Sequence, residues 1–72
     1  MRREYLVIIE RADDGKYGAY VPDLPGCAVV GYARPSQARR SIEIAIRMHI
    51  QGMIEDGLAV PKPSTRSDYV AA

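Results

Sequence analysis

The chain has 72 residues, of which 47% are hydrophobic and 26% charged, and it contains neither Trp nor Phe. This length accommodates one domain, and the composition is that of an ordinary globular protein rather than a disordered or fibrous one. A net charge of +1, from ten Lys and Arg against nine Asp and Glu, provides no broad field that would attract nucleic acid or an anionic membrane.

Cysteine usage and hydropathy indicate the compartment. The single cysteine, Cys27, has no partner for an internal disulfide, and no Cys and His residues stand at the spacing of a zinc site. The longest aliphatic run, residues 6–9, is far shorter than the roughly 20 residues that span a bilayer. We therefore expect a cytoplasmic protein that has no membrane contact and needs no metal or other cofactor.

Two strands and a hairpin are predicted at the start of the chain. Residues 5–9 are apolar on both alternating faces and rich in β-branched side chains, which is typical of a strand in the middle of a sheet. The polar segment at residues 13–16 contains Asp-Gly, a strong hairpin signal. Residues 17–21 then alternate between two faces, with Tyr17 and Tyr20 on opposite sides. We expect these two strands to pair antiparallel.

A tight turn and a third strand follow. Pro25 and Gly26 suit the centre of a type II turn, because proline fixes φ and glycine tolerates a positive φ. For Asp23, which stands between two prolines, we expect hydrogen bonds to nearby backbone N–H groups. Residues 27–32 predict the third strand, with Gly31 at a bulge. The three strands form an antiparallel meander.

One long helix is predicted from Gln37 to about Asp56, with Ser36 as the N-cap and Gly57 as the C-terminal stop. An apolar stripe at helical spacing is expected to cover one face of the sheet; it comprises Ala38, Ile42, Ala45, Ile46, His49 and Met53. Further apolar side chains flank this stripe and predict a second buried surface, the interface of a homodimer or homotetramer; they are Ile44, Met48, Ile50 and Ile54.

The C-terminal residues complete the predicted fold. Residues 60–67 read as an extended linker, and residues 68–71 predict a fourth strand. A strand after a helical crossover lies parallel to its neighbour, so we expect it beside the first strand, in the order 3-2-1-4. The fold class is α+β, a single βββαβ domain over residues 1–72.

The chemistry-bearing residues do not predict an enzyme. His49 is the single histidine and falls in the apolar stripe, and Cys27 reads as a small buried hydrophobe. A βββαβ sheet resembles the front half of the RNase H fold, whose nucleases bind two metal ions through carboxylates. The corresponding acids here are Glu10, Glu43 and Asp68, and their places on separate faces and strand ends do not converge. We expect no catalytic and no metal-binding residue.

Three segments together resemble the HicB family of antitoxins. They are the strand and turn Tyr17–Cys27, the histidine-containing end of the helix at residues 46–57, and the exit Val-Pro-Lys-Pro-Ser at residues 60–64. The resemblance extends over nearly the whole chain. It implies a partial RNase H-like fold that oligomerises and that binds a small mRNA-cleaving toxin, HicA, to block it.

The resemblance also assigns candidate residues for partner contact. Residues 22–26 match the turn motif of the family, for which it implies a structural role. Exposed aromatics and the exposed side of the turn are the candidates, since aromatic side chains bury much area at low entropic cost; the residues are Tyr17, Tyr20, Asp23 and Leu24.

The chain departs from many family members at its C-terminal end. Nine residues follow Pro63, too few for the DNA-binding domain that many members carry, so we expect no direct DNA binding. Two functions stay open on the sequence: an antitoxin that neutralises a HicA-type toxin by protein–protein binding, and an orphan oligomeric scaffold or small-ligand-binding protein without a toxin.

Overall fold

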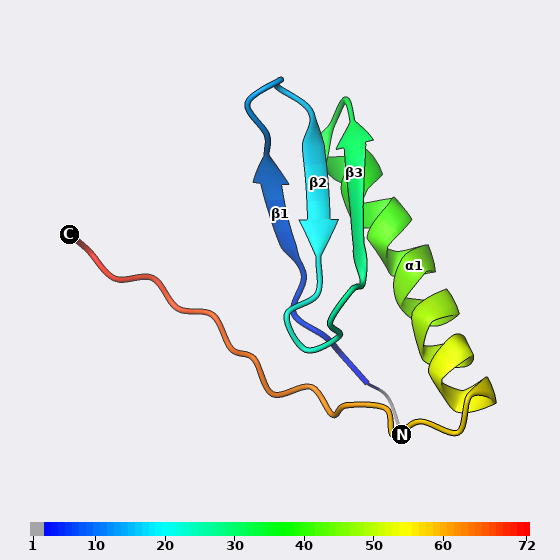
Figure 1. The fold of residues 1–72 in the computed structure, drawn as a ribbon. Coiled ribbons are helices and arrows are strands. Elements are labelled where there is room, and N and C mark those ends of the chain that lie inside the picture. Colours follow the sequence, from blue (N-terminus) through cyan, green and yellow to red (C-terminus); the bar gives the residue numbers. More distant parts are fainter. Residues whose placement is uncertain (1–2) are drawn as a thin grey trace.

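Three antiparallel strands followed by one long helix form an α+β fold in the computed structural model, which describes residues 3–72 (Figure 1). The elements are β1 (Ile8–Arg11), β2 (Tyr17–Tyr20), β3 (Ala28–Tyr32) and α1 (Pro35–Glu55). The sheet order is β1-β2-β3, and α1 contacts all three strands from one side. The predicted meander and long helix are confirmed.

The β1–β2 hairpin forms where the Asp-Gly signal predicts it. The two strands are antiparallel, with Ile8 opposite Tyr20 and Arg11 opposite Tyr17. In the connecting turn Gly15 adopts a φ of 83°, a conformation that glycine reaches without a steric penalty. The backbone N–H of Lys16 donates to Asp14 Oδ1 at 2.9 Å, which satisfies one donor of the turn.

A bulge interrupts the pairing of β2 with β3. Ala19 lies opposite Val29 and Tyr17 opposite Tyr32, so two residues of β3 face the single residue Gly18. Gly31, one of those two, has a φ of 90°, and the predicted bulge is confirmed. The extra residue sharpens the local twist of β3.

The connection between β2 and β3 consists of two consecutive turns. The N–H of Leu24 donates to the carbonyl of Val21 at 3.1 Å, and the N–H of Cys27 donates to the carbonyl of Leu24 at 3.0 Å. Gly26, at the third position of the second turn, has a φ of 84°, which confirms the type II turn. A further hydrogen bond from Val21 N–H to Cys27 O closes the loop at 3.1 Å.

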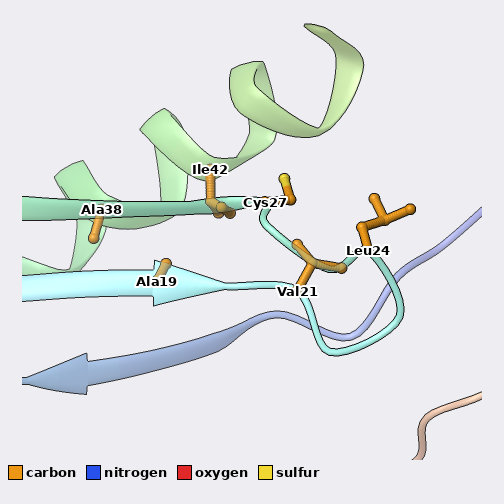
Figure 2. Packing of buried hydrophobic residues seen from close by; sticks show 6 residues of the cluster. All are labelled: Ala19, Val21, Leu24, Cys27, Ala38 and Ile42. Atoms are coloured by element: carbon orange, nitrogen blue, oxygen red, sulfur yellow. The ribbon is translucent and has the colours of Figure 1, made fainter. Parts of the chain in front are cut away.

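The hydrophobic core joins this loop to β2 and α1 (Figure 2). Its buried members are Ala19, Val21, Leu24, Cys27, Ala38 and Ile42. Leu24 has no exposed surface at all, so the loop is a structural part of the core. Cys27 is buried as predicted, and burial raises the pKa of its thiol, which makes it a poor nucleophile.

The helix begins two residues earlier than predicted. Arg34 is the N-cap and Pro35 the first helical residue, where the fixed φ of proline suits a helix start and its missing N–H costs nothing. The predicted N-cap, Ser36, is therefore wrong. The side chain of Gln37 accepts the backbone N–H of Arg34 at 3.2 Å, which satisfies that donor.

The helix ends at a glycine, as predicted. Gly57 has a φ of 71°, its N–H donates to Ile54 O at 3.1 Å, and the N–H of Leu58 donates to Met53 O at 2.9 Å. This pair of hydrogen bonds is a Schellman motif, which satisfies carbonyls that the helix end leaves free.

The predicted apolar stripe of α1 faces the sheet. Ala38 and Ile42 are buried, and the remaining four members, Ala45, Ile46, His49 and Met53, are half-buried. On the exposed side Glu43 forms ion pairs with Arg39 at 3.6 Å and with Arg47 at 3.5 Å. These pairs are exposed to solvent and contribute little to stability.

The predicted central position of the first strand is wrong. Residues 5–7 are extended but unpaired, β1 begins at Ile8, and it lies at an edge of the sheet. The reason is that residues 68–71, predicted as the fourth strand beside it, form no strand: residues 58–72 carry no strand, turn or bend. Beyond α1 the chain passes the end of the sheet and runs away from it (Figure 1).

Asp23 holds this tail to the body. Its carboxylate accepts the backbone N–H groups of Ser64 at 2.9 Å and Thr65 at 3.0 Å, and their hydroxyls at 3.1 and 2.6 Å. The hydroxyl of Tyr5 also donates to the carbonyl of Pro61. The hydrogen bonds expected for Asp23 thus come from residues 41 and 42 positions away and not from its own turn. We call this arrangement the Asp23 clamp.

The clamp requires the charged form of Asp23. Hydrogen bonds from Thr65 and then from Ser64 hold the pKa of Asp23 far below its ordinary value of 3.8, because they stabilise the carboxylate. Because the pKa of Asp23 is lower in the folded state, the clamp makes its full contribution to stability at pH values above the ordinary pKa. This contribution is lost as the pH falls toward the lowered pKa.

Removing the charge should release the tail. For Asp23→Asn we expect the amides of Ser64 and Thr65 to exchange with solvent at neutral pH nearly as fast as in an unstructured peptide, because the four accepted hydrogen bonds need the carboxylate. Hydrogen exchange followed by NMR measures this. Asp13→Asn, which removes the same charge from the β1–β2 hairpin, is the control. Unchanged protection in Asp23→Asn would contradict the clamp.

Two glycine substitutions test the packing of the bulge. A methyl group at position 18 would lie 2.7 Å from the carbonyl oxygen of Val29, whereas one at position 52 in α1 meets nothing within 4 Å. Gly18→Ala should therefore lower the free energy of unfolding by roughly 1–3 kcal/mol. Gly52→Ala should raise it by roughly 0.5–1 kcal/mol, because alanine favours a helix. Urea denaturation of both variants measures these free energies of unfolding. Equal changes in the two variants would show that the bulge tolerates a side chain.

Candidate protein-interaction surfaces

The face of the sheet opposite α1 is the first candidate surface. Ala19 is buried on the helix side, so its neighbours Gly18 and Tyr20 point to the other side. Residues paired with Tyr20 share that side, and Val30 alternates with the core-facing Val29. We call this surface the outer sheet face; it consists of Ile8, Glu10, Gly18, Tyr20, Ala28 and Val30. Val30 is 82% exposed and Tyr20 is 41% exposed.

A hollow of about 350 Å³ lies on this face. It is lined by residues of all three strands and of the β1–β2 turn, among them Gly18, Tyr20 and Val30. Gly18 contributes no side chain to the lining, and an added methyl group there would lie 2.7 Å from Val29 O and 3.3 Å from a side-chain carbon of Val30. Charged residues of both signs also line it: Glu10, Arg11, Asp14 and Lys16. An apolar floor with a few charged groups at its rim suits contact with a protein or a small ligand.

The four residues predicted for partner contact are not brought together. Tyr20 stands on the outer sheet face, while Tyr17 is half-buried and packs against the core. Asp23 is engaged by the tail, and the side chain of Leu24 is fully buried. Tyr20 is thus the one of the four that offers a large exposed surface to another molecule.

The flanks of α1 form the second candidate surface. Ile44 and Met48 are exposed and lie one turn apart on one flank. On the other flank Ile54 is exposed, whereas Ile50 is half-buried and packs against the core. The four residues predicted for an oligomer interface therefore divide into two separate pairs, and Ile50 already has packing partners within its own chain.

The structure assembles no metal centre from the acids considered in the sequence. Within residues 3–72, no group of three or more His, Cys, Asp and Glu is placed to hold a metal ion. Glu10 is on β1, Glu43 is paired with two arginines, and Asp68 lies in the tail, where it accepts the N–H of Tyr69 at 2.7 Å. In the same part of the chain, no helix is long and apolar enough to cross a membrane.

Sequence reasoning missed two features of these surfaces. One is the Asp23 clamp, whose two halves are separated by 41 residues and share no recognisable spacing. The other is the hollow on the outer sheet face, which depends on Gly18 lying opposite the bulge. The glycine within β2 was the available signal for it.

Comparison with known proteins identifies the family. The model of the HicB-like antitoxin of bacterial toxin–antitoxin systems matches residues 5–72. A 14.9 kDa protein from the rep-hol intergenic region of Haemophilus phage HP1 is 39% identical over 66 residues, which cover 92% of this chain. Those residues make up 48% of the phage protein, so the chain spans about half the length of that relative.

Two further relatives are UPF0150 proteins. One, from Thermoplasma acidophilum, is 33% identical over 69 residues that cover 96% of this chain and 99% of the relative. The other, from Synechocystis, is 36% identical over 56 residues that cover 78% of this chain and 76% of the relative. The family match takes in the meander, the helix and the tail together, and the chain belongs to the family of HicB-like antitoxins of bacterial toxin–antitoxin systems.

Proposed function

We propose that this chain acts as an antitoxin that neutralises a small HicA-type mRNA-cleaving toxin by protein–protein binding and catalyses no reaction itself. The observation that carries the proposal is the family match over residues 5–72. The structure adds a physical reason: a small fold that leaves a sheet face and two helix flanks apolar and exposed has surfaces suited to protein partners. We place the protein in the cytoplasm, where such a toxin acts on mRNA.

The outer sheet face is the surface that we assign to the toxin. It carries Tyr20, an aromatic residue that buries much area at low entropic cost, beside the almost fully exposed Val30. The adjoining hollow can accept a protruding side chain of a partner, and its charged rim can fix the orientation of that partner.

Self-association through the flanks of α1 is a second part of the proposal. Ile44, Met48 and Ile54 expose apolar surface that a dimer or tetramer would cover, and Ile50 extends the surface at its buried edge. We further propose that the fold is a partial RNase H-like βββαβ unit once the fourth strand has formed.

A small-ligand-binding scaffold without a toxin is the second candidate function. The hollow of about 350 Å³ favours it, because pockets for small molecules have volumes of roughly 300–1,000 Å³. This candidate predicts that a small molecule copurifies with the protein and that less of it is retained by Val30→Asp, an exposed change in the lining of the hollow.

Toxin binding can be tested with a purified HicA-type ribonuclease. We expect the purified chain to stop cleavage of an RNA substrate at a fixed stoichiometry. Tyr20→Ala combined with Val30→Asp should weaken the complex at least about tenfold, roughly 1.4 kcal/mol, because both side chains are exposed on the outer sheet face. Isothermal titration calorimetry measures the affinity.

The matched control for this test is Glu43→Gln, an exposed change on the opposite side of the molecule. It should leave toxin affinity unchanged. Failure of the unmodified chain to inhibit or bind the ribonuclease would refute the antitoxin proposal. A complex that tolerates the double variant would instead move the toxin site to another surface.

Charges on the helix flanks test the oligomer. Met48→Glu combined with Ile54→Glu should reduce the mass of the largest species in sedimentation velocity, because both side chains are exposed and their apolar contacts would be lost. Arg40→Glu, on the solvent side of α1, is the control. A mass that does not change in the double variant would remove the helix flanks from the interface.

A further inference from the structure

The tail beyond the Asp23 clamp makes no contact that buries it. Residues 62–72 are all exposed, and Tyr69 and Val70 keep 99% and 90% of their surface accessible. Residues 58–72 contain no turn or bend, and the C-terminal end points away from the sheet (Figure 1). Residues 66–72 are therefore an extended segment that exposes two large apolar side chains to water.

This segment has the composition of a strand. Tyr and Val are favoured in strands, and residues 68–71 carry the pattern from which a fourth strand is predicted. The core consists of six buried residues. Small domains bury a low fraction of their surface, and their stability is correspondingly marginal. Covering Tyr69 and Val70 would add apolar burial that the isolated chain lacks.

The sheet offers one suitable edge. The outer edge of β1 is unpaired, and residues 5–7 before it are extended and half-buried. Positive φ values occur within residues 3–72 only at Gly15, Gly26, Gly31 and Gly57, so no left-handed residue interrupts the backbone from residue 3 to residue 11. The other edge, β3, contains the bulge at Gly31, and a bulge hinders the addition of another strand.

The clamp fixes the point at which the tail leaves the body. Two successive backbone N–H groups, of Ser64 and Thr65, are fixed by one carboxylate, and the chain continues from there without a turn. Residues 66–72 span about 23–25 Å when extended, at roughly 3.3–3.6 Å per residue. This reach exceeds the length of the four-residue β1, so the segment can lie along a strand of a neighbouring molecule.

We propose that the tails of two copies of this chain are exchanged. Residues 67–71 of one copy pair with the outer edge of β1 in the other, and the reciprocal contact completes a twofold-symmetric dimer. The predicted fourth strand then forms between molecules, and main-chain hydrogen bonds satisfy the open edge. This inference concerns the chain alone and does not rest on toxin binding.

Amide hydrogen exchange at two protein concentrations tests whether the tails are swapped between two molecules. In the purified full chain at high concentration, the amides of residues 67–71 should be protected. Dilution until sedimentation shows monomers should return them to the rate of an unstructured peptide. The amide of Ala19 in β2 should stay protected throughout, because it belongs to the sheet of each monomer.

Tyr69→Ser combined with Val70→Ser should abolish the tail protection at high concentration and halve the mass of the dimer. These side chains are almost fully exposed in the monomer, so the body should stay folded. Ala72→Ser, at the end of the same tail, is the control and should keep both protection and mass. Met48→Glu with Ile54→Glu should keep the tail protection, which separates the two proposed interfaces.

Three results would overturn the proposal. Protection of residues 67–71 that persists unchanged in the monomer would place the strand on its own chain. Absence of protection at every concentration would mean that the tail forms no strand. A dimer that survives the Tyr69 and Val70 substitutions with unchanged mass would show that the tail does not hold it together.

Discussion

The burial of the loop between β2 and β3 is the interaction on which the rest of the structure depends. Three of the six buried side chains, Val21, Leu24 and Cys27, belong to this loop. Two prolines and a left-handed glycine restrict its backbone, so less conformational entropy is lost when Leu24 packs into the core. The loop also presents Asp23 outward, where it holds the tail.

A core this small explains why so much apolar surface stays exposed. One helix covers one face of a three-stranded sheet, and residues 3–72 contain no further helix or strand that could cover the other face. Tyr20 and Val30 on the outer sheet face, Met48 on α1 and Tyr69 in the tail are consequences of that shortage. For a member of an antitoxin family, these surfaces are where binding to other chains completes the burial that folding begins.

Sequence reasoning was accurate where a residue determines its own backbone conformation. It was less accurate where burial or pairing depends on residues distant in the sequence. Pro25-Gly26, Asp14-Gly15 and Gly57 each predicted a turn or a helix end that the structure contains. The helix start was misplaced because Ser36 and Pro35 both suit the start of a helix. In the structure Pro35 is the first helical residue. The family resemblance to HicB antitoxins rested on the same turn and helix, and the family match supports it.

The remaining errors concern which residues, distant in the sequence, lie next to one another in the fold. Nothing in the local sequence distinguishes a buried Leu24 from an exposed one between two prolines. The partner of Asp23 lies 41 residues away, beyond the reach of any turn rule. The central position of the first strand depended on a neighbour, residues 68–71, which does not pair with it in the single chain.

The Asp23 clamp has a consequence for the order of folding. Each strand pairs with the one before it, and α1 follows directly, so these contacts close short loops and are expected to form quickly. The contacts of the tail join residues 41, 42 and 56 positions apart, and they bury no core side chain. The tail therefore docks after the meander and helix have formed, and it detaches before they unfold, as a separate unit of low local stability.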